Sequence, residues 1–441
     1  MKKKLTALFL ALTLVFALGV NAMSADDDTA EAVAETAEAM EEIEPVEAAA
    51  EAAEAEETEA ATEEASEPPA PSPDAEGTLS FANIGSRMHA SYYPMYALQE
   101  NIDDAASHDY EWRSDYLRGR LNAVADAQWM VSMAGDATTF NMLQSNYDAL
   151  RDEFDAIKDG DKQKEDADTI RQYKNAQDQL VIYGESIYMA VKAYEAGDAT
   201  AARMIDQLDR QLQEVRLRAE LGQVPAMTVD QLETGRAQAV SQRDTARMEK
   251  ENYLLLLKSM VGTGLDEPLT LGALPKITAA QLDAMNLEKD LAQAEEVSYS
   301  LYDARKQIDD FKKGSYDDAI RMFGSDGKTF ESSQAKHALQ AMEYQYQDTL
   351  TTFELNFRKL YAQVKDAAQV LEAKKTALAS QEKSYAVSAL KYEQGSISAN
   401  ALADAKDELA AAKDNVSGAE RDLFAKYHTY RWAVEYGIIN S

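Results

Sequence analysis

The chain has 441 residues, of which 45% are hydrophobic and none is cysteine, and it carries a formal net charge of −34. The lack of cysteine excludes disulfide bonds, thiolate metal sites and a lipid-modified cysteine. An acidic excess of this size argues against nucleic acid and anionic lipid as partners.

Residues 1–25 have the pattern of a secretory signal peptide. Three lysines at positions 2–4 precede an apolar run from Leu5 to Val20, followed by small residues that suit a cleavage site. The run is too short, with the wrong flank, for a stable membrane span. We therefore predict export to the cell envelope, at the outer membrane if the cell has one and otherwise at an extracytoplasmic location.

The segment 26–76 is predicted to be a disordered linker. Between Asp26 and Glu76 there are 20 carboxylates and neither lysine nor arginine, and the segment ends in a proline-rich stretch at 68–73. Charge repulsion and the scarcity of aromatic residues leave little to offset the entropy of ordering. Transient helix, favoured by the alanine and glutamate content, is the alternative.

Residues 77–262 form the first predicted helical repeat. After an entry segment at 77–99 we expect a helix to about residue 157, a turn at 158–161 and a long helix to residue 221, in which Gly197 could introduce a kink. Apolar and small residues recur every seven positions along this helix, at Tyr173, Leu180, Ile187, Tyr194, Ala201, Leu208 and Val215. A turn follows at Gly222, Gln223, Val224 and Pro225, and a returning helix runs to residue 262.

A connector at 263–278, with Pro268 and Pro275, leads to the second predicted repeat at 279–441. We expect a helix at 279–322, a turn at 324–327, a helix to residue 394 and a last helix to about residue 436. The seven-residue spacing is clearest here, at Leu350, Phe357, Val364, Leu371, Leu378, Tyr385 and Tyr392, and again at Leu402, Leu409, Val416, Leu423 and Tyr430. The turn between these two helices is Gly395, Ser396, Ile397 and Ser398.

These patterns predict an all-α protein built from long antiparallel coiled-coil hairpins in two internal repeats. The turning glycines Gly222 and Gly395 are 173 residues apart, and each is followed two positions later by a β-branched residue. An internal duplication is the economical explanation. Each glycine taken alone could be a simple helix cap, because glycine readily adopts the left-handed conformation that ends a helix.

The segments 221–232 and 394–405 resemble the paired signature of the outer membrane efflux protein family, also called the TolC family. In both segments a glycine, a β-branched residue two positions later and a small residue or serine open a helix. The apolar residues of the signature, at the seventh and tenth positions after the glycine, are Val229 with Leu232 and Leu402 with Ala405. The resemblance implies a homotrimeric helical tunnel. Its turns would form the tip where a periplasmic-type adaptor (membrane fusion) protein docks, in a complex with an inner-membrane pump.

Two departures from the family pattern matter. The family narrows its pore with aspartates six and nine residues beyond the second glycine, whereas this chain has Ala401 and Asp404 at these positions. A ring of Asp404 is implied, and a solvated carboxylate on a helix face is the alternative. The family also inserts strands of a membrane β-barrel where this chain has only the turns 158–161 and 324–327, so we predict a divergent member with little or no β-barrel.

Residues suited to catalysis or metal binding are sparse. The four histidines show no metal-binding spacing, and no nucleophile motif or phosphate-binding loop is present, so no catalytic residue, metal or cofactor is expected. We predict a non-enzymatic efflux or export conduit of the cell envelope that docks an adaptor through its hairpin tips. The alternative is an exported structural coiled-coil spacer with no role in transport.

Overall fold

The computed structural model describes residues 74–325 and 329–439. The predicted signal peptide at 1–25, and the predicted linker except its last residues, lie outside the described residues. The described chain is overwhelmingly helical, which confirms the all-α class. Its two strands, β1 (Thr78–Leu79) and β2 (Thr270–Leu271), pair in parallel, with Thr78 opposite Thr270.

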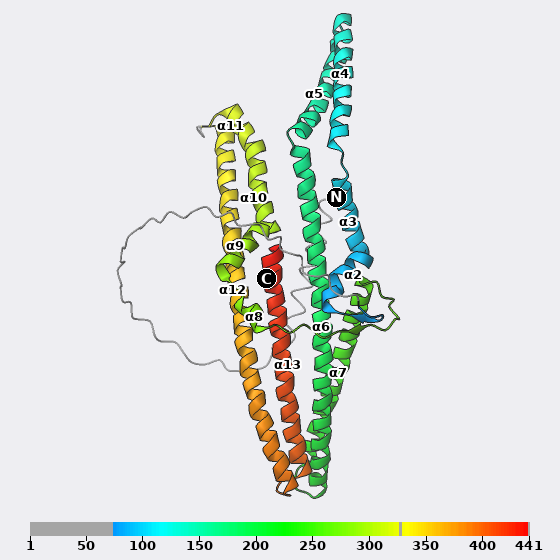
Figure 1. Ribbon diagram of the computed structural model, residues 1–441, viewed down its shortest axis with the longest axis vertical. Helices are drawn as coiled ribbons and strands as arrows, with labels where there is room; N and C mark the ends of the chain where they lie inside the picture. The colour runs from blue at the N-terminus through cyan, green and yellow to red at the C-terminus, as the bar shows by residue number, and fades with distance from the viewer. Residues whose placement is uncertain (1–73, 326–328, 440–441) are drawn as a thin grey trace, which may run out of the picture. The chain divides into compact units, whose positions relative to one another are not determined.

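The first long hairpin consists of α6 (Asp161–Glu220) and α7 (Ala226–Met260), which pack along each other (Figure 1). Helix α6 is continuous over 60 residues, so Gly197 does not break it, and the standard rise gives it a length of about 90 Å. The turn between the helices lies at the positions expected from the sequence.

The second long hairpin consists of α12 (Phe330–Glu393) and α13 (Ala399–Tyr436). The seven-residue pattern marks its seam away from the turn, because Phe357, Val364 and Leu371 of α12 are buried, as are Leu423 and Tyr430 of α13. Tyr392, the last residue of the series in α12, is exposed. Burial of this single stripe is what holds two antiparallel helices together.

The prediction of one helix ending near residue 157 is wrong, because the segment contains two breaks. After η1 (Phe81–Asn83) and α2 (Ile84–Ser91), three helices follow in its place, α3 (Tyr93–Ala106), α4 (Tyr110–Ala134) and α5 (Ala137–Lys158). The cause lies in two aspartates. Each accepts hydrogen bonds from backbone N–H groups at the start of a helix, Asp109 for α4 and Asp136 for α5. Helices α4 and α5 pack as a third hairpin.

The prediction of a single helix at 279–322 is also wrong. The segment contains α8 (Ala279–Asp283), α9 (Leu287–Val297), α10 (Tyr299–Phe311), the π-helical turn η2 (Lys312–Tyr316) and α11 (Asp317–Phe323). Asn286 and Ser298 each begin a new helix by accepting a hydrogen bond from a backbone N–H three residues later. These caps compete with a continuous helix.

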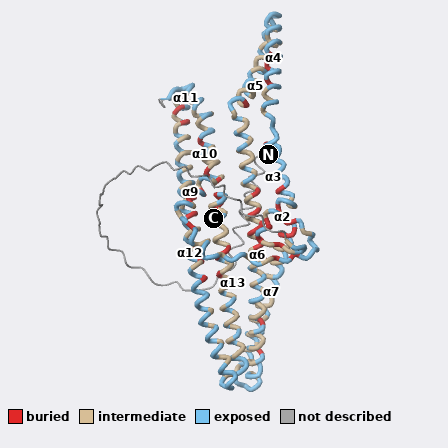
Figure 2. Tube along the Cα trace, in the orientation of Figure 1, coloured by how far each residue is buried: buried red, intermediate tan, exposed pale blue. Residues whose placement is uncertain are grey.

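Buried side chains gather in two clusters, and the ends of the long hairpins are largely exposed (Figure 2). The first cluster joins β1, α2, α6 and α7, with members that include Leu79, Ile84, Met88, Tyr188, Leu257 and Met260. The second joins α9, α10, α12 and α13, with members that include Leu301, Phe357, Val364, Tyr430 and Ala433. In the part of the chain that the structure describes, every helix is too short or too polar to cross a membrane.

Two further glycines end the returning helices in corresponding ways. Gly262 follows α7 with a φ of 71°, and Gly437 follows α13 with a φ of 64°. Ser91, at the end of α2, fills the space over Gly262, and Ser298, between α9 and α10, fills the space over Gly437. In both halves of the chain a break between two short helices therefore packs against the glycine that ends the long hairpin.

Candidate functional site

The turn between α6 and α7 is a regular glycine cap. Gly222 has a φ of 72°, and its N–H donates to the carbonyl of Ala219 at 2.9 Å, while the N–H of Gln223 donates to the carbonyl of Arg218 at 2.8 Å. This pair of hydrogen bonds defines the Schellman motif and requires a left-handed residue at the glycine.

The turn between α12 and α13 has the same hydrogen bonds. Gly395 has a φ of 68°, and its N–H donates to the carbonyl of Tyr392 at 2.9 Å, while the N–H of Ser396 donates to the carbonyl of Lys391 at 2.8 Å. The two turns therefore have one backbone design at the atomic level.

The residues after each glycine also correspond. Val224 and Ile397 are half-buried, whereas Gln223 and Ser396 are exposed. Pro225 precedes α7 with an extended backbone, and Ser398 begins α13 by accepting a hydrogen bond from the N–H of Ala401 at 3.2 Å. Each turn thus tucks its β-branched side chain inward and presents polar backbone and side chains outward.

Large apolar side chains near the turns are exposed. They are Leu217, Leu221 and Met227 at the first turn and Val387, Leu390 and Tyr392 at the second. Charged residues such as Arg218, Glu220, Lys391 and Glu393 are interleaved with them. Apolar contact points within a polar rim are typical of surfaces that bind other proteins.

The two turns lie at the same height, because ion pairs join α6 to α13 at matched distances from their glycines. Arg210, twelve residues before Gly222, pairs with Asp407, twelve residues after Gly395. Arg203 and Asp414 form a second pair, one heptad farther from each turn.

Asp404, the candidate constriction residue, lies next to this ladder. Its side chain is 53% exposed, and its Oδ1 is 3.9 Å from a guanidinium nitrogen of Arg210. The stronger partner of Arg210 is Asp407, so the carboxylate of Asp404 remains largely available to solvent. The sequence pointed to Asp404 but not to the arginine beside it.

Further polar contacts connect α6 with the second half of the chain. Asp168 pairs with Lys306 of α10 at 2.8 Å. Nearer the middle of α6, the buried Glu185 accepts a hydrogen bond from the indole Nε1 of Trp432 at 2.8 Å and lies 2.7 Å from His428 Nε2. His428 is therefore a structural residue in the contact between the halves, which its isolated position in the sequence did not indicate.

Ion pairs also hold the first hairpin together. Arg247 and Arg243 of α7 both hydrogen-bond to Asp198 of α6 at 2.7 Å, and these bonds lower the pKa of Asp198 to about 2. Farther toward the turn, Arg236 binds Asp209.

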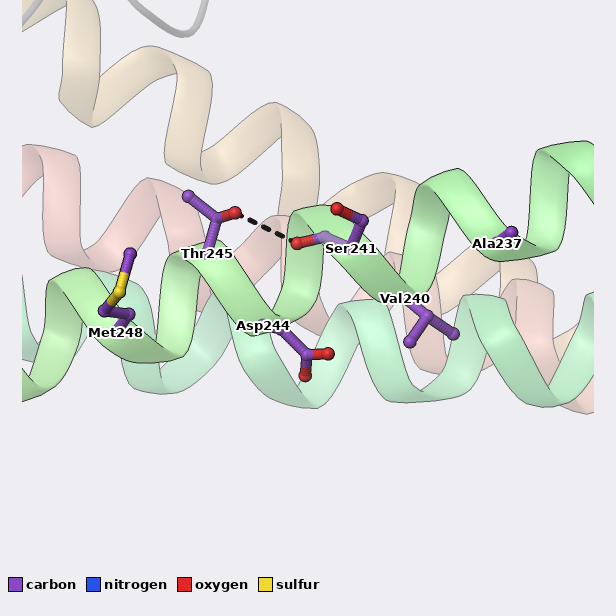
Figure 3. Close-up of a pocket in the computed structure, with 6 residues that line it drawn as sticks. All are labelled: Ala237, Val240, Ser241, Asp244, Thr245 and Met248. Carbon is purple, nitrogen blue, oxygen red and sulfur yellow. Dashed lines mark hydrogen bonds between the residues drawn. The ribbon is translucent and has the colours of Figure 1, made fainter.

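One face of α7 is uncovered over much of its length. Figure 3 shows a shallow hollow lined entirely by α7, where the Thr245 hydroxyl donates to the Ser241 carbonyl at 3.0 Å. The six lining residues are Ala237, Val240, Ser241, Asp244, Thr245 and Met248. The hollow is open on a single helix, which suits packing against another helix better than enclosing a small molecule.

The long helices lie in the order α7, α6, α13, α12, because α6 packs on α7 and α13, and α13 packs on α12. Helices α7 and α12 are thus the two edges of this layer. Exposed apolar residues occur along both edges, including Met248 and Leu256 on α7 and Leu355 and Val370 on α12.

Among residues 74–325 and 329–439 no group of side chains is arranged to hold a metal ion. The described part of the candidate site consists of turns, edges and ion pairs. Its geometry suits binding to other helices.

No protein-family model matches the chain, and no curated protein matches it. Among solved structures it is similar to the CmeC outer membrane channel of Campylobacter jejuni, with 15% identity, a TM-score of 0.41, and coverage of 66% of this chain and 69% of that one. It is similar to the outer-membrane channel OprN, with 11% identity, a TM-score of 0.44, and coverage of 80% and 92%. It is also similar to the open-state MtrE outer membrane channel of Neisseria gonorrhoeae, with 13% identity, a TM-score of 0.41, and coverage of 77% and 88%.

Proposed function

We propose that this chain is a conduit component of the cell envelope, of the kind implied by its resemblance to the outer membrane efflux protein family. In this proposal three copies close into a helical tunnel, and an adaptor protein that works with an inner-membrane pump docks at the hairpin tips. The observation that carries the proposal is the pair of matched glycine turns, at Gly222 and Gly395, exposed at the same height.

The matched turns support docking because capping two helices does not require the two caps to have the same structure. Two helix ends could be capped in many ways, yet both turns use the same two hydrogen bonds and the same half-buried β-branched residue. Neither glycine has an atom within 4 Å of the place where a Cβ would lie. The helix caps require the left-handed glycines, and the open space beside each glycine leaves both turns accessible to a partner.

The uncovered edges support assembly of several copies. Exposed apolar residues on α7 and α12 favour contact between the α7 edge of one copy and the α12 edge of the next. Such a head-to-tail contact between two different edges generates a closed ring when the rotation between copies closes. Three copies is the number that the family resemblance implies. Asp404, beside Arg210, is the carboxylate that we assign to the narrow end of the tunnel.

Docking can be tested with a photoactivatable cross-linking residue placed at Gln223 or at Ser396 in the producing cells. We expect cross-links to a periplasmic-type adaptor protein. Gly222→Val and Gly395→Val should abolish these cross-links, because valine resists the left-handed conformation.

Gly235→Val is the matched control, because Gly235 lies within α7, has open space around it and has no positive φ. This variant should retain the cross-links. Cross-links that survive the substitutions at both turns would contradict docking at the tips. A chain that stays monomeric and gives no cross-link to an adaptor would instead favour the exported structural spacer.

A further inference from the structure

The hairpin of α4 and α5 has a regular seam near its base. Leu117, Leu121 and Val124 of α4 are buried at alternating spacings of four and three residues. The side-chain amide of Gln128 continues the series, donating to the Oε1 of Gln144 on α5 at 3.0 Å. This heptad spacing identifies which side of α4 faces its partner helix.

Near the turn of this hairpin, large apolar side chains lie off the seam. Trp129, Met130 and Met133 of α4 are 65%, 61% and 73% exposed, and Met142 of α5 is 70% exposed. By the spacing from Leu117 and Leu121, these three residues of α4 fall on its outer positions, which are normally polar in water. Exposed large apolar residues that gather in one place mark a binding surface.

The same part of the hairpin is almost free of charge. Residues 127–147 contain one charged residue, Asp136, in a chain where 28% of residues are charged. The carboxylate of Asp136 accepts hydrogen bonds from the N–H groups of Thr138 and Thr139 and from the Thr139 hydroxyl at 2.6 Å. Its charge is therefore used locally, to cap α5.

The glycine turns, at the other end of α6, differ from the α4–α5 turn in their charged residues, and this difference indicates what the α4–α5 turn binds. At the glycine turns the exposed apolar residues alternate with charged ones, which suits a protein surface. At the α4–α5 turn a tryptophan and three methionines stand on both flanks, and the charged residues nearest to them are Asp136, which caps α5, and Asp126, one helical turn before Trp129. Tryptophan is enriched at the boundary between lipid headgroups and hydrocarbon, where its ring is apolar and its N–H remains hydrogen-bonded.

We propose that the α4–α5 turn, residues 127–147, inserts into the headgroup region of an electrically neutral lipid bilayer. The helical part from residue 127 to Ala134 has a length of about 12 Å, comparable with the roughly 5–10 Å to which interfacial helices sink. The turn contains no lysine or arginine to attract anionic lipid, and the chain carries a net charge of −34, so neutral lipids are the fitting class. The turn enters the headgroup layer without spanning the membrane.

This proposal does not depend on the proposed function, and it can be tested by flotation of the purified chain with phosphatidylcholine vesicles. The wild type should float with the vesicles, and replacing part of the phosphatidylcholine with phosphatidylglycerol should weaken binding. Trp129→Ala should lower the partition coefficient on the order of tenfold, because an aromatic side chain dominates interfacial burial.

Trp112→Ala is a closely matched control, since Trp112 is also on α4 and is 62% exposed. It lies near the base of the hairpin, stacked on Tyr116 and next to Arg113, so its removal should leave binding unchanged. In a Trp112→Phe protein, the fluorescence emission should shift to shorter wavelength when vesicles are added. Adding Trp129→Phe should abolish that shift.

Failure of the wild type to float would overturn the proposal, and so would equal losses in Trp129→Ala and Trp112→Ala. If Trp129→Ala instead lowers the mass measured by light scattering, with no vesicle binding by either protein, the turn is a contact between copies and the lipid proposal is wrong. The tip cross-linking experiment reports on adaptor docking separately, so the two proposals can fail independently.

Discussion

Gly262 provides a quantitative test of how the returning helix α7 is anchored. Its φ of 71° already disfavours any side chain. A Cβ at this position would lie 2.7 Å from Ser91 Oγ and still closer to Ser91 Cβ, well inside van der Waals contact. Gly262→Ala therefore combines backbone strain with overpacking against one identified side chain.

We expect Gly262→Ala to lower the free energy of unfolding by about 2–5 kcal/mol. Left-handed strain contributes about 1–2 kcal/mol and overpacking about 1–3 kcal/mol. Ser91→Gly removes the obstructing Cβ, although it also removes the hydroxyl that donates to the Arg87 carbonyl at 2.6 Å. In the double variant the overpacking should disappear, which gives a favourable coupling energy of about 1–3 kcal/mol in a double-mutant cycle measured by urea unfolding.

Strictly additive effects in this cycle would refute the reasoning, because they would show that Ser91 does not limit the space over Gly262. Gly437→Ala offers the contrasting case. Its Cβ would lie 2.5 Å from the backbone nitrogen of Ser298, so Ser298→Gly should fail to rescue it. If Ser298→Gly restored the stability of Gly437→Ala as fully as Ser91→Gly restores that of Gly262→Ala, the structural explanation would be contradicted as well.

Other substitutions should separate strain from charge effects. Gly395→Ala, with open space but a positive φ, should cost about 1–2 kcal/mol, whereas Gly235→Ala should be neutral or stabilising by up to about 1 kcal/mol, as thermal unfolding can show. Burial raises the pKa of Asp178 to about 6, above its ordinary 3.8, so the folded chain binds this proton more tightly than the unfolded chain. Its contribution to stability is therefore lost as the pH rises from about 4 to about 6. Asp178→Asn should remove this pH dependence and add about 2 kcal/mol to the free energy of unfolding at pH 7, as urea titrations can show. The two arginines lower the pKa of Asp198 to about 2, so its contribution to stability is present above pH 4 and lost as the pH falls toward 2. Asp198→Asn should lower the free energy of unfolding by about 1 kcal/mol at pH 7. A loss of equal size at pH 2 would contradict this role of the ionised Asp198.

The long hairpins could be predicted from sequence because one physical constraint repeats along them. Residues such as Phe357 and Val364 must keep facing a partner helix, and the seven-residue spacing records that requirement. Glycines 222 and 395 were identified as turns because few other residues adopt their backbone conformation. Their exposure and equal heights, however, depend on packing between the halves.

The short helices were predicted poorly because local capping overrides a weak helical pattern. Asp109, Asp136, Asn286 and Ser298 each interrupt a stretch of good helix formers, and their capping roles are visible only as single residues. The spacing of Leu117, Leu121 and Val124 could have indicated the α4–α5 hairpin.

The contacts between the two halves had no signal in one sequence. Arg210 finds Asp407, and Glu185 finds Trp432, across about 200 or more residues of chain. The local spacing of residues does not predict which side of α6 faces α13, because charged residues occur on several faces of that helix. Tertiary packing decides it.

Disulfide cross-linking across the proposed edge contact tests the central claim most directly. Met248 of α7 and Val370 of α12 are exposed, and they stand at nearly equal heights, 26 residues after Gly222 and 25 residues before Gly395. The chain has no cysteine, so Met248→Cys with Val370→Cys introduces a single defined pair. Because α6 and α13 separate these edges within one copy, oxidation should link neighbouring copies and give covalent species of up to three chains that revert on reduction. A double variant that remains a single chain after oxidation, and a monomer by light scattering, would contradict the tunnel account.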